Sequence, residues 1–193
     1  MSAFTRKVKI IFTTSHRPSS KLRTFIKELA ATIPFSIKLN RGKKTLNALY
    51  LEALELGAKN IVVAFERKGN PSAMLLYKVL ERPLGVKKEV LIRIAGVSLW
   101  REIPDAVKPY NPSSIAVLVS EEEIELAEAL ATMFSAQAVF EYDEAKKFDV
   151  LIKVMSKGNV SLVIFENPSS KRIVGPIIKV CGVRFWREQQ KSL

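Results

Sequence analysis

The sequence predicts an α/β protein made of two similar half-domains, each a mixed sheet with flanking helices. Three observations predict this fold class. β-branched runs alternate with amphipathic segments, two distant segments repeat nearly the same residues, and 48% of the 193 residues are hydrophobic. A chain of this length and composition closes a core without disulfide or metal cross-links. We expect a single domain with an N-terminal lobe of about residues 1–108 and a C-terminal lobe of about residues 109–193.

The first half begins with a β-branched run at Val8–Thr13, which predicts a strand. The next helix should start at Ser19 or Ser20, because serine caps helices and apolar residues then recur at helical spacing. A second helix is expected at Lys43–Leu56, where Gly57 provides a left-handed end. Three extended segments complete this half: Ile61–Phe65, Ala73–Leu80 and Val90–Leu99.

The second half is expected to repeat this plan of strand, helix, strand, helix, strand and a final antiparallel ribbon. Ser120 should cap a helix whose first turn holds Glu121–Glu123, because the helix dipole favours carboxylates there. A second helix is expected at about Tyr142–Met155, ending at Gly158. The extended segments of this half are Ile115–Val119, Val160–Phe165 and Arg172–Phe185. The linker between the halves should lie at Pro104–Ser113, where three prolines interrupt any periodicity.

The chain contains an internal repeat. Ile92–Glu102 aligns with Ile178–Glu188 without a gap, and the two tryptophans of the chain, Trp100 and Trp186, fall in the same slot. Two further pairs of segments match in the same order: Glu28–Thr32 with Glu128–Thr132, and Asn60–Glu66 with Asn159–Glu166. Ordered matches of this kind indicate duplication. The tryptophans have two interpretations, repeat packing in a core or stacking on nucleic-acid bases.

The charge distribution points to a polyanionic partner. The chain carries a net charge of +12, and residues 1–108 hold 21 basic against 8 acidic residues, whereas residues 109–193 hold 10 against 11. Excess positive charge confined to one half favours nucleic-acid binding there. Cys181 and His16, the single residues of their types, exclude a closed zinc site of cysteine and histidine ligands. We expect a cytoplasmic protein without cofactor or membrane span.

Three basic segments of the first half are candidate phosphate contacts. The first surrounds the start of the first helix, where hydroxyls, backbone N–H groups and cations occur together; the second precedes the second helix at Gly42; the third is a glycine-containing turn. The candidate RNA-binding residues are Ser15, Arg17, Ser19, Lys21, Arg23, Lys27, Arg41, Lys43, Lys44, Arg67 and Lys68. The alternative is that the first segment is a capped helix with a solvated basic face and the third an ordinary turn.

No enzyme signature is present. The segment around Gly42 lacks the spacing of a phosphate-binding loop of nucleotidases. The acidic residues near position 121 are explained by the helix start, and Cys181 lies in an apolar run typical of a buried strand. We therefore expect a protein that binds without catalysing a reaction.

Residues 13–29 together with 40–42 and 66–71 resemble the Brix domain family of ribosome-biogenesis proteins, most closely its short archaeal members. The matching positions are Ser15, Arg17, Pro18, Ser19, Lys21, Leu22, Phe25, Arg41, Gly42, Arg67, Gly69 and Pro71. The resemblance implies two halves that each resemble an anticodon-binding domain of aminoacyl-tRNA synthetases. It also implies binding to precursor ribosomal RNA during subunit assembly and rRNA processing, without catalysis. An alternative is a scaffold that binds another ribosome assembly protein through its acidic segment 121–150, with incidental RNA affinity.

Overall fold

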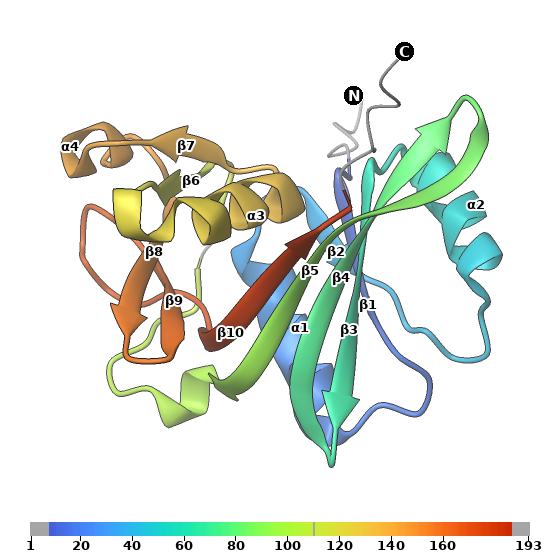
Figure 1. Cartoon of the computed structure of the whole chain (residues 1–193), viewed down its shortest axis with the longest axis horizontal. Coiled ribbons are helices and arrows are strands. Elements are labelled where there is room, and N and C mark those ends of the chain that lie inside the picture. The colour runs from blue at the N-terminus through green and yellow to red at the C-terminus, as the bar shows by residue number, and fades with distance from the viewer. Residues whose placement is uncertain (1–7, 110, 187–193) are drawn as a thin grey trace, which may run out of the picture.

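The computed structural model describes residues 8–109 and 111–186, and these residues form one ten-stranded mixed sheet (Figure 1). The first half contains β1 (Ile10–Thr14), α1 (Ser20–Thr32), β2 (Ser36–Lys38), α2 (Leu46–Leu56), β3 (Asn60–Arg67), β4 (Asn70–Glu81), β5 (Leu84–Ser98) and the 3₁₀ turn η1 (Trp100–Glu102). The second half contains β6 (Ile115–Leu118), the 3₁₀ turn η2 (Glu121–Glu123), α3 (Ile124–Phe134), β7 (Gln137–Val139), α4 (Tyr142–Ala145), β8 (Val150–Lys157), β9 (Val160–Glu166) and β10 (Ile177–Phe185). The predicted α/β fold class is confirmed.

The two halves have the same order of elements and the same strand pairing. The sheet order is β2-β1-β3-β4-β5-β10-β9-β8-β6-β7. In the first half β1 is parallel to β2 and β3, and β4 and β5 follow as antiparallel strands. In the second half β6 is parallel to β7 and β8, and β9 and β10 follow as antiparallel strands. The halves join where β5 and β10 pair antiparallel at the centre of the sheet.

The register at this junction is symmetric about the repeat found in the sequence. Ile92 pairs with Val183, and Val97 pairs with Ile178. The sequence repeat aligns Ile92 with Ile178 and Val97 with Val183. Replacing each residue by its aligned partner therefore turns the first pair into the second, so the pairing has the symmetry of the repeat. The ladder skips Ala95 on β5 and Cys181 on β10, which are also aligned positions. The last two repeat residues, Arg187 and Glu188, lie outside the described residues.

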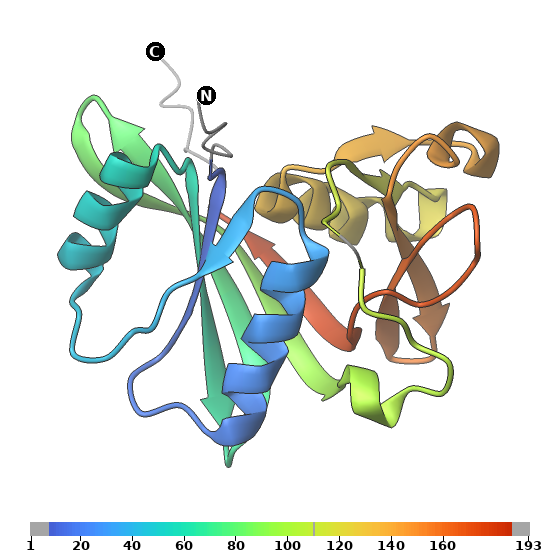
Figure 2. The same cartoon turned by 180° about the vertical axis from the view of Figure 1, so that it is seen from behind.

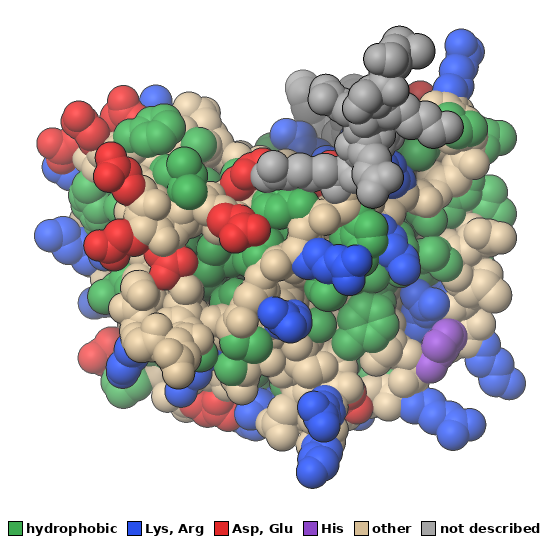
Figure 3. Space-filling view, viewed as in Figure 1, with side chains coloured by type: hydrophobic (Ala, Val, Ile, Leu, Met, Phe, Trp, Pro, Cys, Tyr) green, Lys and Arg blue, Asp and Glu red, His purple; other side chains and the backbone are tan. Residues whose placement is uncertain are grey.

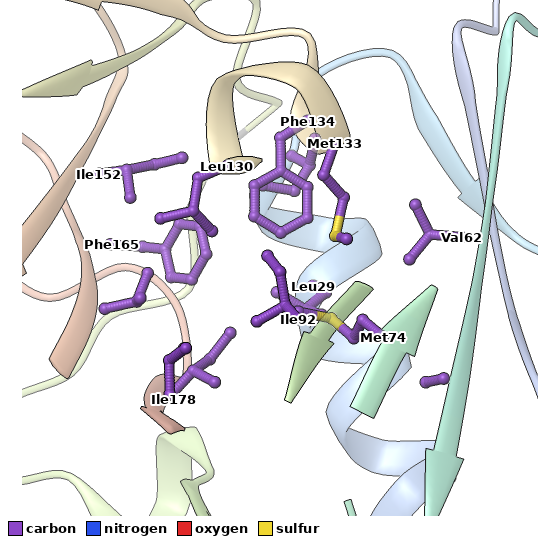
Figure 4. Packing of buried hydrophobic residues seen from close by; sticks show 14 of the residues in the cluster. Leu29, Val62, Met74, Ile92, Leu130, Met133, Phe134, Ile152, Phe165 and Ile178 are labelled. Carbon is purple, nitrogen blue, oxygen red and sulfur yellow. The ribbon is translucent and has the colours of Figure 1, made fainter. Parts of the chain in front are cut away.

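One main core joins the halves on one face of the sheet. α1 and α3 both contribute to it, and the opposite face carries two smaller clusters under α2 and α4. Figure 2 shows α1 running alongside the strands of the first half. Phe134 of α3 has its ring centroid 6.1 Å from that of Phe12 and 5.9 Å from that of Phe165, so it contacts both halves (Figure 4). The single shared core and the continuous sheet hold the two halves together.

Hydrogen bonds from buried side chains also connect the halves. Asn60, which is fully buried at the start of β3, donates from Nδ2 to the carbonyl oxygens of Thr132 and Met133 at 3.3 Å. These carbonyls belong to the last turn of α3 and need donors. The Thr32 hydroxyl of α1 lies 3.2 Å from the Val174 carbonyl oxygen, between β9 and β10.

The predicted second helix of the second half is mostly wrong. Only Tyr142–Ala145 is helical, and Val150–Lys157 forms β8. Val150, Leu151 and Ile152 are fully buried because helices cover both faces of this strand, so their run lacks the alternation typical of a half-buried strand. Gly158 ends no helix; its φ of 61° lies in the two-residue turn between β8 and β9.

Other expectations have mixed outcomes. Ser19 is the N-cap of α1 and Gly57 ends α2 at φ 70°, as predicted. Ser120 makes no capping side-chain hydrogen bond. The match of Asn60–Glu66 with Asn159–Glu166 aligns β3 with β9, whereas the pairing makes β8 the counterpart of β3. The segment Arg172–Phe185 becomes a strand only from Ile177.

Candidate nucleic-acid interface

Three loops of the first half lie together at one edge of the sheet. β2, β1 and β3 are adjacent parallel strands, so their carboxyl ends meet at the same edge. Residues 15–19, 39–45 and 67–70 follow or close these strands. We call these three segments the loop edge. All three basic segments singled out in the sequence thus meet in space.

Hydrogen bonds link the three loops directly. The Ser19 backbone N–H donates to Glu66 Oε2 at 2.9 Å, and the Ser19 hydroxyl donates to the Gly69 carbonyl oxygen at 3.1 Å. His16 Nδ1 lies 3.1 Å from the Gly42 carbonyl oxygen. Gly42 has a φ of 52°, a conformation in which glycine is favoured. The loop edge is therefore a connected surface.

Several of the predicted contact residues have partners within the protein. The Ser19 hydroxyl also accepts a hydrogen bond from the Leu22 N–H, so Ser19 is committed to the cap and to the third loop. Glu66 lies against the α1 N-terminus, where the sequence suggests a phosphate. Lys21 Nζ donates to Asn70 Oδ1 at 3.2 Å, and Lys44 pairs with Glu52. Ser15 is half-buried, and its N–H donates to the Ala64 carbonyl oxygen.

The other predicted residues offer their charge to solvent. Six of them have exposed side chains: Arg17, Arg23, Lys27, Lys43, Arg67 and Lys68. Arg17 and Lys68 have φ values of 52° and 50°. Figure 3 shows Lys and Arg spread over the first half, with Asp and Glu gathered over the upper part of the second half. Arg23 and Lys27 lie on α1, outside the loop edge, and the other four give the loop edge clustered, accessible cations suited to a phosphate backbone.

A hollow of about 520 Å³ opens between the first two loops. Arg17, Arg23 and Arg41 line it, and Arg41 is half-buried. Arg41 Nε is shielded from solvent and has no hydrogen-bond partner among the described residues. The sequence identifies these arginines as cations but gives no sign that they surround a common hollow.

Two of the three corresponding loops of the second half carry the opposite charge, whereas the third, the turn between β8 and β9, follows Lys157. The loop after β6 holds Glu121 and Glu122, and the loop after β7 holds Glu141; all three side chains are exposed. Carboxylates at these positions repel phosphate. The charge asymmetry seen in the sequence therefore falls on topologically equivalent loops.

A second set of cations, which the sequence patterns did not predict, lies on the central strands. Arg93, Lys179 and Arg184 are exposed. Along each strand these cations alternate with residues of the main core, and successive side chains of a strand point to opposite faces of the sheet. The three cations therefore lie on the face opposite the main core. Alternation within β5 and β10 is the signal that could have found them, but bulges at Ala95 and Cys181 interrupt it. Cys181 itself is exposed, so the expectation of a buried position for it is wrong.

Two buried carboxylates have structural partners. Glu28 accepts a hydrogen bond from the Trp100 N–H at 3.1 Å, and burial raises the pKa of its carboxyl. Glu166 accepts from the Tyr142 hydroxyl at 2.9 Å and lies 3.5 Å from Lys153 Nζ. Burial, followed by the hydrogen bond to Glu166, raises the pKa of Tyr142. Each carboxylate ties one element to another.

The two tryptophans are half-buried and occupy corresponding positions after β5 and β10. Arg184 and Lys88 lie over the Trp186 ring, at 5.1 and 5.8 Å from its centroid. Trp100 lies in η1, and its Nε1 is shielded from solvent without a partner among the described residues. Trp100 and Trp186 therefore have different surroundings, although they occupy aligned positions of the sequence repeat.

These features define a class: a mixed α/β protein of two topologically equivalent halves, of which one presents a cationic loop edge. No helix in the described part of the chain is long and apolar enough to cross a membrane.

A scan against family models finds no match. Two archaeal relatives carry the name "Probable Brix domain-containing ribosomal biogenesis protein". The one from Pyrobaculum aerophilum is 31% identical over 76% of this chain and 80% of its own length. The one from Pyrococcus furiosus is 30% identical over 89% of this chain and 82% of its own.

Solved structures agree with the sequence relatives. A crystal structure described as a ribosomal biogenesis protein of Aeropyrum pernix superposes with a TM-score of 0.78 at 30% identity, covering 90% of this chain and 96% of that one. Mil, an archaeal Imp4-like protein, shares the fold at 18% identity, with a TM-score of 0.66 over 91% of this chain and 99% of its own. The chain belongs to the Brix domain-containing ribosomal biogenesis proteins, as its loop motifs suggested.

Proposed function

We propose that this protein is a non-catalytic assembly factor that binds precursor ribosomal RNA through the loop edge of its first half. The single observation that carries the proposal is the convergence of the three basic segments at the carboxyl ends of β1, β2 and β3. Exposed arginine and lysine side chains on a connected surface suit contacts with a phosphate backbone. Membership of a family named for ribosomal biogenesis supports ribosomal RNA as the polyanionic partner.

The shared topology of the halves supports their descent from one unit that was duplicated. The two copies together form a single domain, with lobes at about residues 1–108 and 109–193. The symmetric register of β5 and β10 supports this origin because unrelated halves have no reason to pair Ile92 with Val183 and Val97 with Ile178. The likeness of each half to an anticodon-binding domain stays a prediction.

The test compares two matched sets of neutralising substitutions. The loop-edge set is Lys43→Gln, Arg67→Gln and Lys68→Gln; the control set is Lys157→Gln, Lys171→Gln and Arg172→Gln. All six side chains are exposed, each set removes one arginine and two lysines, and Lys68 and Lys171 both have positive φ. Binding to a ribosomal RNA fragment is measured by fluorescence anisotropy over a salt series.

The loop-edge set should weaken binding strongly and flatten the plot of log affinity against log salt. The slope should change by about 0.7 for each phosphate of a single strand that the protein no longer neutralises. The control set should leave the slope nearly unchanged. Equal losses of affinity from the two sets would show that net charge alone attracts RNA. Adding tRNA as a competitor then distinguishes specific binding of the ribosomal RNA fragment, which tRNA does not displace, from non-specific binding, which it does.

A second candidate function is a protein-binding scaffold on the second half. Ile124 and Phe140 are 60% and 72% exposed there, beside the carboxylates of η2 and α4. Exposed large apolar side chains next to carboxylates could contact an apolar and basic surface of a partner protein. If this candidate is correct and RNA affinity is incidental, the two substitution sets above will have equal effects.

A further inference from the structure

The topology of the first half places a crevice where adjacent strands send their connections to opposite faces of the sheet. β1 and β2 are neighbours. α1, which follows β1, packs in the main core, whereas α2, which follows β2, packs on the other face. Loops that part in this way leave a crevice at the carboxyl ends of the strands, and ligands of α/β proteins bind in such crevices. The hollow of about 520 Å³ lies at this point.

The size and walls of the hollow suit a small organic ligand with a negative charge. Its volume falls within the usual range of small-molecule sites. Pro18 and Leu39 provide apolar wall, and the three arginines provide charge. A surface that contacted only phosphates would have no need of an apolar recess.

The arginines can serve both parts of a nucleotide. A guanidinium binds phosphate oxygens with two parallel hydrogen bonds, and its flat face stacks on a base. Arg41 lines the hollow while half-buried, so its side chain is more restrained than that of an exposed arginine. Arg17 and Arg23 reach the same hollow from the start of α1, so cations from two loops face one space.

We infer that the crevice between the β1–α1 and β2–α2 loops binds one unstacked nucleotide of a single-stranded RNA, with the base in the recess and its phosphate on the arginines. This inference rests on the RNA-binding function proposed above and adds to it a requirement for a single strand. Bases in a duplex are stacked and paired, so they cannot enter the recess. The equivalent crevice of the second half is lined by loops that carry Glu121, Glu122 and Glu141, and it should bind no nucleotide.

The test uses a short single-stranded RNA with one 2-aminopurine, a base whose fluorescence rises when it leaves the stack. The same strand annealed to its complement is the duplex probe. Wild-type protein should bind the single strand about tenfold more tightly than the duplex at equal salt, the value of one well-made base contact. Binding should also raise the 2-aminopurine fluorescence for at least one placement of the probe along the strand.

Two single substitutions separate the crevice from its surroundings. Arg41→Gln and Lys43→Gln each remove one charge from the same loop, but only Arg41 lines the hollow. Arg41→Gln should abolish the fluorescence rise and the preference for the single strand. Lys43→Gln should weaken the binding of both RNA forms to a similar degree, because it removes a backbone contact, but should keep the preference and, at saturating protein, the fluorescence rise. Circular dichroism melting verifies that the variants fold, and the wild-type comparison of single strand with duplex needs no variant.

The outcomes are distinct. If wild-type protein binds duplex and single strand equally, with no fluorescence rise at any probe position, the nucleotide crevice is wrong while RNA binding by the loop edge stands. If loss of Arg41 leaves both signals intact, the nucleotide lies elsewhere and the inference fails. If neither RNA form binds, the proposed function itself fails.

Discussion

Gly182 of β10 lies opposite Arg93 of β5, and a Cβ atom at Gly182 would come within 2.5 Å of an Arg93 guanidinium nitrogen. The aligned position of the first half, Gly96, pairs with Lys179, and a Cβ atom at Gly96 would lie 3.8 Å from Lys179 Cδ, an ordinary contact distance. Each half thus places a glycine under the long cationic side chain of the other. The two aligned glycines thus occupy equivalent places at the junction of the halves.

Gly175 is expected to tolerate a side chain far less well than Gly182. A Cβ at Gly175 would lie 2.8 Å from Phe165 Cβ, and Phe165 is fully buried in the main core. The ring cannot move without displacing its neighbours, so Gly175→Ala should lower the free energy of unfolding by about 1–3 kcal/mol. Gly182→Ala displaces only the end of an exposed arginine and should change it by less than about 0.5 kcal/mol. Urea denaturation measures both, and similar losses would contradict the packing described.

Asn60 should be a strong point of coupling between the halves. Its amide donates to α3 carbonyls, and its Oδ1 accepts from Lys78 Nζ at 3.1 Å. Asn60→Ala leaves buried carbonyls without their donor, so unfolding free energy should fall by about 1–3 kcal/mol. Asn47→Ala, on the exposed side of α2, is the control and should have little effect. A loss at Asn60 no greater than that at Asn47 would mean that water replaces the amide.

Stability and RNA affinity should respond to different residues at the start of α1. Phe25 is fully buried, and Phe25→Ala should cost about 3–5 kcal/mol of stability. Arg17 is exposed with φ 52°, so Arg17→Asn, which tolerates this backbone conformation, should change the melting temperature little while weakening RNA binding. Thermal melting and anisotropy on both variants check this. A stable Arg17→Asn protein with unchanged affinity and salt slope would remove Arg17 from the interface.

Sequence patterns predicted the first half better than the second, for physical reasons. α1 has a capping serine and an apolar stripe, and α2 ends at a glycine, so local signals agree with the fold. β8 is buried on both faces, which removes the alternation that distinguishes a strand, and Gly158 is equally consistent with a helix end or a hairpin turn. Local pattern therefore could not choose between helix and strand at residues 146–157.

The sequence predicted which residues form the candidate site, but not how they lie relative to one another. Motifs and charge identified the three basic segments, since these are properties of the sequence. Two relationships depend on strand order, which no single segment encodes: Glu66 meets Ser19, and Arg17 and Arg41 share a hollow. Tertiary pairing decides which cations stay available.

Asp149 should make the stability of the second half depend on pH. Its Oδ2 accepts hydrogen bonds from the backbone N–H groups and hydroxyls of Ser113 and Ser114, at 2.7–3.1 Å. These bonds, those from Ser113 foremost, lower the pKa of Asp149. A lowered acid pKa means that the unfolded chain binds the proton more readily, so the stabilisation is complete above the ordinary aspartate pKa of about 3.9 and is lost as pH falls through the folded value.

Asp149→Asn should therefore be less stable than the wild type at neutral pH, and the gap between the two should narrow as pH falls below about 4. Asp105→Asn, an exposed aspartate outside any helix or strand, is the control and should track the wild type more closely. Urea denaturation across pH 3 to 7, an interval chosen to span the ordinary aspartate pKa of about 3.9, measures the gap. A gap that stays constant over this range would show that the hydrogen bonds to Ser113 and Ser114 do not favour the charged carboxylate, and that Asp149 joins the linker to β8 by shape alone.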